Sequence, residues 1–176
     1  MGSISKVNEV DNDVPDIPGN GVLLASGDLS AAASWDSGAF AVYDKIIMQF
    51  SLLGSQTSVV RMTLNNLSNA TYYYTTLANG STTMASAQTS ILLFHSTGAV
   101  YPCLGTLQFH GKRIGAETSC AVASDIEGSS FSANGSVLLG ATQLTDFPAG
   151  GLTSIQIAID AGTLTGTVRI YGVNYP

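Results

Sequence analysis

Two histidines, His95 and His110, are the residues of this sequence best suited to acid–base chemistry. Nucleophilic catalysis needs a nucleophile, a base and a group that orients the base, and histidine is the usual base. Each histidine directly follows a short apolar run, SILLF before His95 and LQF before His110, and no G-x-S-x-G segment supplies a nucleophile. We therefore expect both histidines to lie at strand ends, without a catalytic role.

Two carboxylates that are two residues apart, Asp125 and Glu127, could be compared with a glycosidase pair. Glycoside hydrolysis uses two carboxyl groups on opposite sides of a cleft, whereas these two would share one face of a strand near a turn. Solvated side chains are the expected outcome. The sequence therefore predicts a protein that is not an enzyme and that uses no cofactor.

The segment DNDVPD offers oxygen ligands for a metal ion at Asp11, Asp13 and Asp16. The segment departs from a calcium loop, because Pro15 and Asp16 occupy the positions of the third ligand and the required glycine, and no glutamate follows at the twelfth position. The only cysteines, Cys103 and Cys120, are too far apart for a C-x-x-C zinc motif. We predict two buried thiols and no metal site.

Four aromatic residues could bind a sugar by stacking on its ring: Trp35, Tyr72, Tyr73 and Tyr74. In a strand, Tyr72 and Tyr74 share one face and Tyr73 takes the other, so at least one of them belongs to the core or to a subunit interface. Interfaces are themselves rich in tyrosine. The sequence favours core or interface positions and keeps glycan binding as the alternative.

The composition of the chain indicates a protein that assembles with others. Charged residues make up only 10% of the 176 residues, against roughly 25% in ordinary soluble domains. Large uncharged surfaces are safest when they are buried, so we expect a homo-oligomer, a trimer, within a larger assembly. A net charge of −6 with six basic residues argues against nucleic acid, and no apolar run reaches the roughly 18 residues of a membrane helix.

The elements that would position these residues are short strands, because apolar residues alternate from Gly21 onward. Ile46, Met48, Phe50 and Leu52 should share one face, as should Val60, Met62 and Leu64. Expected strands cover residues 22–26, 43–54, 58–64, 71–77, 88–94, 105–111, 118–124, 135–144 and the two halves of 152–173. Nine or ten such strands with frequent turns predict an all-β, two-sheet antiparallel sandwich of jelly-roll type over residues 21–176. Residues 28–35, DLSAAASW, are the best candidate for a short helix.

The closing strands, within residues 152–173, have the most regular alternation of apolar and polar residues. The last strands are expected to form a hairpin that turns at residues 160–163 and pairs Ile155, Ile157 and Ile159 with Val168 and Ile170.

Residues 1–20 contain a third of the acidic residues, two prolines and no apolar periodicity or signal-peptide core, so we expect an extended arm there. The acidic residues of that arm are the candidates for binding a partner: Glu9, Asp11, Asp13 and Asp16.

The closing stretch LTSIQIAIDAGTLTGTVRIYGV, residues 152–173, resembles the end of small bacteriophage virion proteins and fibre domains. Those proteins end on a Thr-Ser-Ile strand, a glycine-centred turn and a strand that finishes Tyr-Gly-Val or Tyr-Gly-Ile. The segment 34–66 is similar to the early strands of the same family, in which a Tyr-Asp pair, here Tyr43-Asp44, opens a strand. The resemblance covers residues 22–173 and is weak over residues 81–149.

The resemblance implies a β-sandwich in a phage particle, and it carries no catalytic residues. It implies framework roles for Thr153, Ile155, Gly166, Tyr171 and Gly172. Family members occur on capsids, on tails and at fibre tips, so location in the virion is the expectation. We expect a capsid decoration protein whose arm lies on the major capsid protein or another virion protein; the alternative is a tail or fibre-tip protein that binds a receptor glycan.

Overall fold

The computed structural model describes residues 21–66, 72–78, 81–97, 102–112, 121–128, 136–143 and 150–176. The expected arm with Glu9, Asp11, Asp13 and Asp16 lies outside these residues, as does Cys120. The described chain is all-β. Its twelve strands are β1 (Val22–Ala32), β2 (Ser34–Asp36), β3 (Lys45–Gly54), β4 (Thr57–Leu64), β5 (Tyr72–Ala78), β6 (Ser81–Gln88), β7 (Ile91–Thr97), β8 (Cys103–His110), β9 (Ala121–Gly128), β10 (Ser136–Gln143), β11 (Ile155–Ile159) and β12 (Leu164–Val173).

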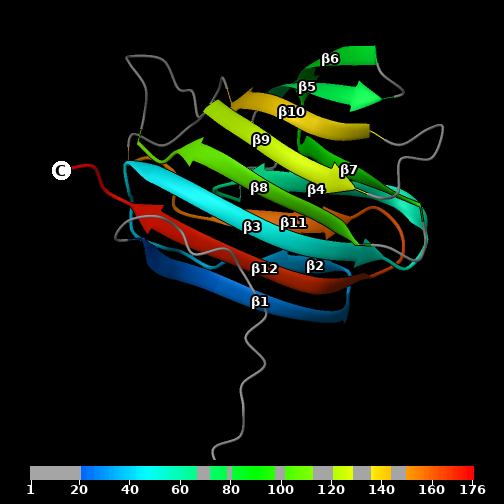
Figure 1. The fold of residues 1–176 in the computed structure, drawn as a ribbon, viewed down its shortest axis with the longest axis horizontal. Coiled ribbons are helices and arrows are strands. Elements are labelled where there is room, and N and C mark those ends of the chain that lie inside the picture. Colours follow the sequence, from blue (N-terminus) through cyan, green and yellow to red (C-terminus); the bar gives the residue numbers. More distant parts are fainter. Residues whose placement is uncertain are drawn as a thin grey trace, which may run out of the picture.

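The strands form an antiparallel sandwich of two layers, as the alternating pattern predicts. The first layer has the order β1-β12-β3-β8-β9 and lies in front in Figure 1, and the second has the order β7-β4-β11-β2 behind it. Without β5, β6, β9 and β10 the two layers are β1-β12-β3-β8 and β2-β11-β4-β7, which is the arrangement of a jelly roll with its two interleaved Greek keys. The prediction of a jelly-roll sandwich is confirmed.

Two connections join the layers at their sides. On one side β10 pairs with β9, with β7 and with β5, so that β5 and β6 extend the sheet beyond the sandwich (Figure 1). On the other side the chain passes from β1 to β2 through Ala33, whose carbonyl accepts a hydrogen bond of 3.2 Å from the N–H of Ile159. One continuous segment therefore occupies the outer edge of both layers.

The core lies between the layers and uses the faces that the alternation predicts. In β3 the four predicted inward residues are 0–5% exposed, and in β4 Val60, Met62 and Leu64 are each 0% exposed. From the last strands Ile155, Ile157, Ile159, Val168 and Ile170 all join the same cluster. Burial of this apolar area is the main driving force for the fold.

The expected closing hairpin is wrong in its pairing. β11 pairs with β4 and β2 in the second layer, whereas β12 pairs with β3 and β1 in the first. The turn at Asp160–Thr163 therefore carries the chain from one layer to the other. The isoleucines of β11 therefore share the core cluster with Val168 and Ile170 but form no ladder with them.

Two local expectations are also corrected. Residues 28–35, expected as a short helix, continue β1 into β2, because β1 pairs along its length with β12 and Trp35 pairs with Ile157. The segment 81–88 forms β6, a strand that the sequence did not predict, paired with β5. Backbone pairing with a neighbouring strand outweighs the helix propensity of three alanines in a row.

Candidate functional site

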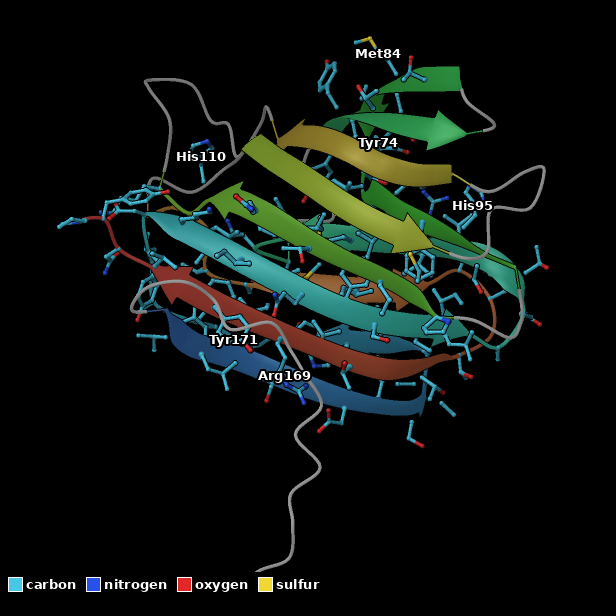
Figure 2. The ribbon with its side chains drawn as sticks, viewed as in Figure 1. Tyr74, Met84, His95, His110, Arg169 and Tyr171 are labelled. Carbon is cyan, nitrogen blue, oxygen red and sulfur yellow. The ribbon has the colours of Figure 1, made fainter. Side chains whose placement is uncertain are left out.

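The two histidines do not meet. His95 lies in β7 opposite Val59 of the second layer, whereas His110 ends β8 in the first layer opposite Lys45, and Figure 2 shows them on opposite sides of the view. Burial, together with the charge of Arg61, lowers the pKa of His95 and favours its neutral form. The two imidazole rings are therefore not placed to act together in one site.

The other candidates for chemistry are two carboxylates and a thiol on the paired strands β9 and β8. Asp125 and Glu127 belong to β9, opposite Thr106 and Leu104 of β8 in the backbone register. Burial raises the pKa of the Cys103 thiol to about 12, which keeps it protonated and unreactive, and this confirms one of the two predicted buried thiols. Over the described ranges, no three His, Cys, Asp or Glu side chains come together to hold a metal ion, and no helix is long and apolar enough to cross a membrane.

The three consecutive tyrosines divide as the alternation predicts. Tyr72 is 0% exposed and Tyr74 is 8% exposed, so both belong to the core, whereas Tyr73 is 38% exposed on the outer side of β5. The hydroxyl of Tyr72 accepts a hydrogen bond of 2.9 Å from the N–H of Leu64 and donates one of 3.4 Å to its carbonyl. This ring therefore fixes the end of β4 and cannot stack on a sugar.

The indole ring of Trp35 packs directly on Gly27. The two residues come from β2 and β1, and a Cβ added to Gly27 would lie 2.6 Å from Cδ1 and 2.9 Å from Cε2 of the indole. Contact this close requires a residue without a side chain at position 27. The indole packs against the core cluster from the side where the chain changes layers, so Trp35 serves the framework and Tyr73 is left as the exposed member of the aromatic set.

The residues that carry the resemblance at the two ends of the chain contact each other. The ring of Tyr43 covers Gly172, where an added Cβ would lie 2.5 Å from Cδ2 and 2.7 Å from Cδ1. Asp44 accepts a hydrogen bond of 3.0 Å from the N–H of Tyr175 and forms an ion pair with Lys112, while its own N–H donates to Asn174 Oδ1. The Tyr-Asp pair thus holds the Tyr-Gly-Val ending in place.

A second contact holds the start of the closing stretch. Asn65 Oδ1 accepts hydrogen bonds from the N–H of Thr153 at 2.7 Å and of Ser154 at 3.3 Å, and Asn65 Nδ2 donates to the carbonyl of Gly151 at 3.2 Å. The N–H of Ile155 donates to Ser37 Oγ at 2.9 Å. Because Asn65 has a φ of 54°, it combines a turn conformation that asparagine tolerates with a side chain that binds three backbone groups.

Asn65 was not among the sequence-based candidates. The pair Asn65-Asn66 directly after an apolar strand was the available signal for a left-handed turn, and both residues have a φ of 54°. The sequence does not reveal that the side chain of Asn65 binds Thr153, because these two residues are 88 positions apart.

The two remaining framework positions are also structural. Gly166 has a φ of +136°, and an added Cβ would collide with the carbonyl of Ser51 in the adjacent strand. Tyr171 lies on the outer face of the first layer between Leu23 and Ile47. These positions shape the ladder around β12 and contain no reactive group.

The sequence matches no protein-family model, and it has no significant match among curated proteins. The clearest exposed surface is the β5–β6 extension at the top of Figure 2, which carries Met84, 84% exposed, and Tyr73.

Proposed function

We propose that this chain is a structural protein of a bacteriophage particle and that it decorates the assembled capsid. The observation that carries the proposal is the contact between the two segments that resemble phage virion proteins. Tyr43-Asp44 packs on and hydrogen-bonds the residues around Gly172, and Asn65 binds the Thr153-Ser154 start of the closing stretch. The resemblance therefore falls on residues that act together in one framework, which supports a shared fold and setting.

Composition supports a place in an assembly. The chain has 10% charged residues and exposes large apolar side chains at several separate points, among them Leu23, Tyr73 and Met84. Such surfaces are best accommodated when copies of the chain, proposed here as trimers, sit side by side on a larger structure. A protein that binds the assembled shell and not its separate subunits stabilises the shell by mass action.

The proposed anchor is the acidic arm. Glu9, Asp11, Asp13 and Asp16 would meet basic side chains of the major capsid protein and so fix the sandwich in place. The alternative, a tail or fibre-tip protein, is favoured by the exposure of Tyr73. It is weakened because Tyr72, Tyr74 and Trp35 pack inside and leave Tyr73 as the exposed ring of these four.

The experiment counts copies on purified particles and removes the arm. Decoration predicts many copies spread over the shell, whereas a few copies near the tail would overturn it. Deletion of residues 1–20 should release the protein from capsids and leave the sandwich folded. A matched variant that keeps the length of the arm but replaces its four carboxylates by amides separates charge from chain length.

A glycan array distinguishes the alternative. Binding that Tyr73→Ala abolishes, with normal unfolding of the variant, would move the assignment to a receptor-binding role. Binding that survives loss of this ring would have to use another surface. Absence of glycan binding, together with many copies on the shell, is the result that decoration predicts.

A further inference from the structure

Three strands of the described sheet pair with a neighbour on one side only: β1, β2 and β6. Exposed strand edges invite pairing with other chains, and natural proteins protect them by short length, irregular register, charge or proline. β2 has three residues, while β1 has two register shifts and an ion pair between Arg169 and the exposed Asp28. These two edges are protected.

β6 has little of this protection. It is eight residues long, and its sequence, STTMASAQ, contains no charge and no proline. From Ser81 to Ala85 it pairs with β5 in regular register; the one register shift and the left-handed Ala87 are confined to its other end. Thr82, Thr83 and Met84 are all exposed, Met84 by 84%.

We propose that β6 is a self-association edge, at which β6 of a second copy of this chain adds to the sheet. The two strands would run antiparallel about a two-fold axis that passes by Met84, so that Met84 of one copy faces Met84 of the other. This register covers the largest exposed apolar side chain of the strand by its own equivalent, which is the self-complementary contact that a two-fold interface requires. The inference goes beyond the proposed function and does not depend on it: it concerns a dimer of the free chain in solution, whereas the trimer proposed above belongs to the assembled particle.

Charge identifies the second copy as the occupant. No Asp, Glu, Lys or Arg occurs between Arg61 and Lys112, a span that includes the whole of β5, β6, β7 and β8. A chain with a net charge of −6 repels its own copies, and this repulsion is least where both contribute an uncharged edge. A basic or an acidic partner strand would gain no electrostatic attraction there. Among the uncharged strands of this span, β6 is the one that pairs on one side only, so β6 of a second copy is the uncharged edge available to it.

The first test measures the mass of the full chain against concentration by sedimentation velocity. We expect a monomer–dimer equilibrium that higher salt strengthens, because salt screens the repulsion between two negative copies. Met84→Lys should weaken dimerisation about tenfold or more, since it places like charges directly opposite each other. Leu104→Lys, which puts the same charge on the exposed face of β8, is the matched control and should leave it unchanged.

Three results would overturn the proposal: a monomer at all concentrations, dimerisation unaffected by Met84→Lys in a normally folded protein, or equal weakening by both lysine variants. A second measurement checks the register. Met84→Cys should give a disulfide-linked dimer under mild oxidation, and neither the parent chain nor Leu104→Cys should do so. Failure of Met84→Cys to crosslink, in a variant that still dimerises, would exclude the two-fold pairing.

Discussion

The ring of Tyr43, just before β3, lies over Gly172 near the end of β12, so that a methyl group at position 172 would have no room. Two residues 129 positions apart (172 − 43) thus share one tightly packed contact, and hydrogen bonds from Tyr175 and to Asn174 place Asp44 beside it. The Tyr-Asp pair and the Tyr-Gly-Val ending form one structural unit.

Gly172→Ala should lower the free energy of unfolding by about 1 to 3 kcal/mol, the usual range for overpacking a well-filled site. Urea denaturation followed by fluorescence measures the effect. Gly150→Ala is the matched control, because nothing lies within 4 Å of a Cβ added there. In a Tyr43→Ala background the same Gly172→Ala change should have a smaller effect; equal effects in both backgrounds would show that the ring is not the obstacle.

Asp44 should make the free energy of unfolding depend on pH in the acidic range. The hydrogen bond that Asp44 accepts from the Lys112 ammonium, followed by the one from the N–H of Tyr175, lowers the pKa of Asp44 from the ordinary value of 3.8. A carboxyl group whose pKa is lower in the folded than in the unfolded state stabilises the fold above its unfolded pKa, and this stability is lost as the pH falls through the folded pKa. The free energy of unfolding should therefore fall below about pH 4.

Asp44→Asn should reduce the slope of stability against pH in that acidic range, and Lys112→Met should reduce it in part, because the backbone donor remains. Urea denaturation at a series of pH values from neutral downward measures the slope. An unchanged acid limb in Asp44→Asn would mean that other carboxyl groups account for it.

Asn65 should be more important for stability than its surface turn suggests. Asn65→Ala removes the acceptor for the N–H groups of Thr153 and Ser154, and it places alanine at a φ of 54°. We expect a loss of about 2 to 3 kcal/mol, since unsatisfied part-buried donors and backbone strain add. Asn65→Gly keeps the backbone conformation and should lose only the hydrogen-bond part. If the glycine variant is as stable as the parent chain in urea denaturation, the side chain does not hold this segment.

Trp35 and Tyr73 should behave oppositely when each is replaced by alanine. Trp35 packs on Gly27 and the core, so Trp35→Ala should lower stability by about 2 to 4 kcal/mol. Tyr73 is partly exposed on the outer side of β5, so Tyr73→Ala should change stability by less than about 1 kcal/mol. Thermal unfolding by circular dichroism compares the two, because Trp35 is the only tryptophan and its loss removes the fluorescence signal. A stable Trp35→Ala protein would return this residue to the list of binding candidates.

Alternation along a strand predicted which residues face the core, because the period of two is a local property of the chain. The inward faces of β3, β4, β11 and β12 are all as expected. Which strands pair is not a local property. β11 and β12 look like a hairpin in the sequence, yet each finds its partners in a different layer, since a ladder between them would remove one of the two from its own sheet.

The two segments whose strand conformation the sequence did not predict, residues 28–35 and β6, have weak local signals for a strand. The alanines of 28–35 favour a helix on their own, and their strand conformation depends on pairing with β12, far away in the sequence. β6 consists mostly of small residues and lacks the alternating large apolar residues that mark a strand. Of the candidate sites, the division of the three tyrosines followed from alternation, whereas the packing of Trp35 on Gly27 required knowledge of where the chain changes layers.

The pairing of β1 with β12 has a consequence for the order in which the protein is made. β1 is the first described strand and its ladder partner is the last, with Val22 aligned to Gly172. During synthesis β1 must wait, without its ladder partner, until residues 164–173 have left the ribosome. Contacts this distant in sequence make for slow folding. The first layer therefore closes only after β12 has been made, and molecular chaperones that shield waiting strands should raise the yield of folded protein.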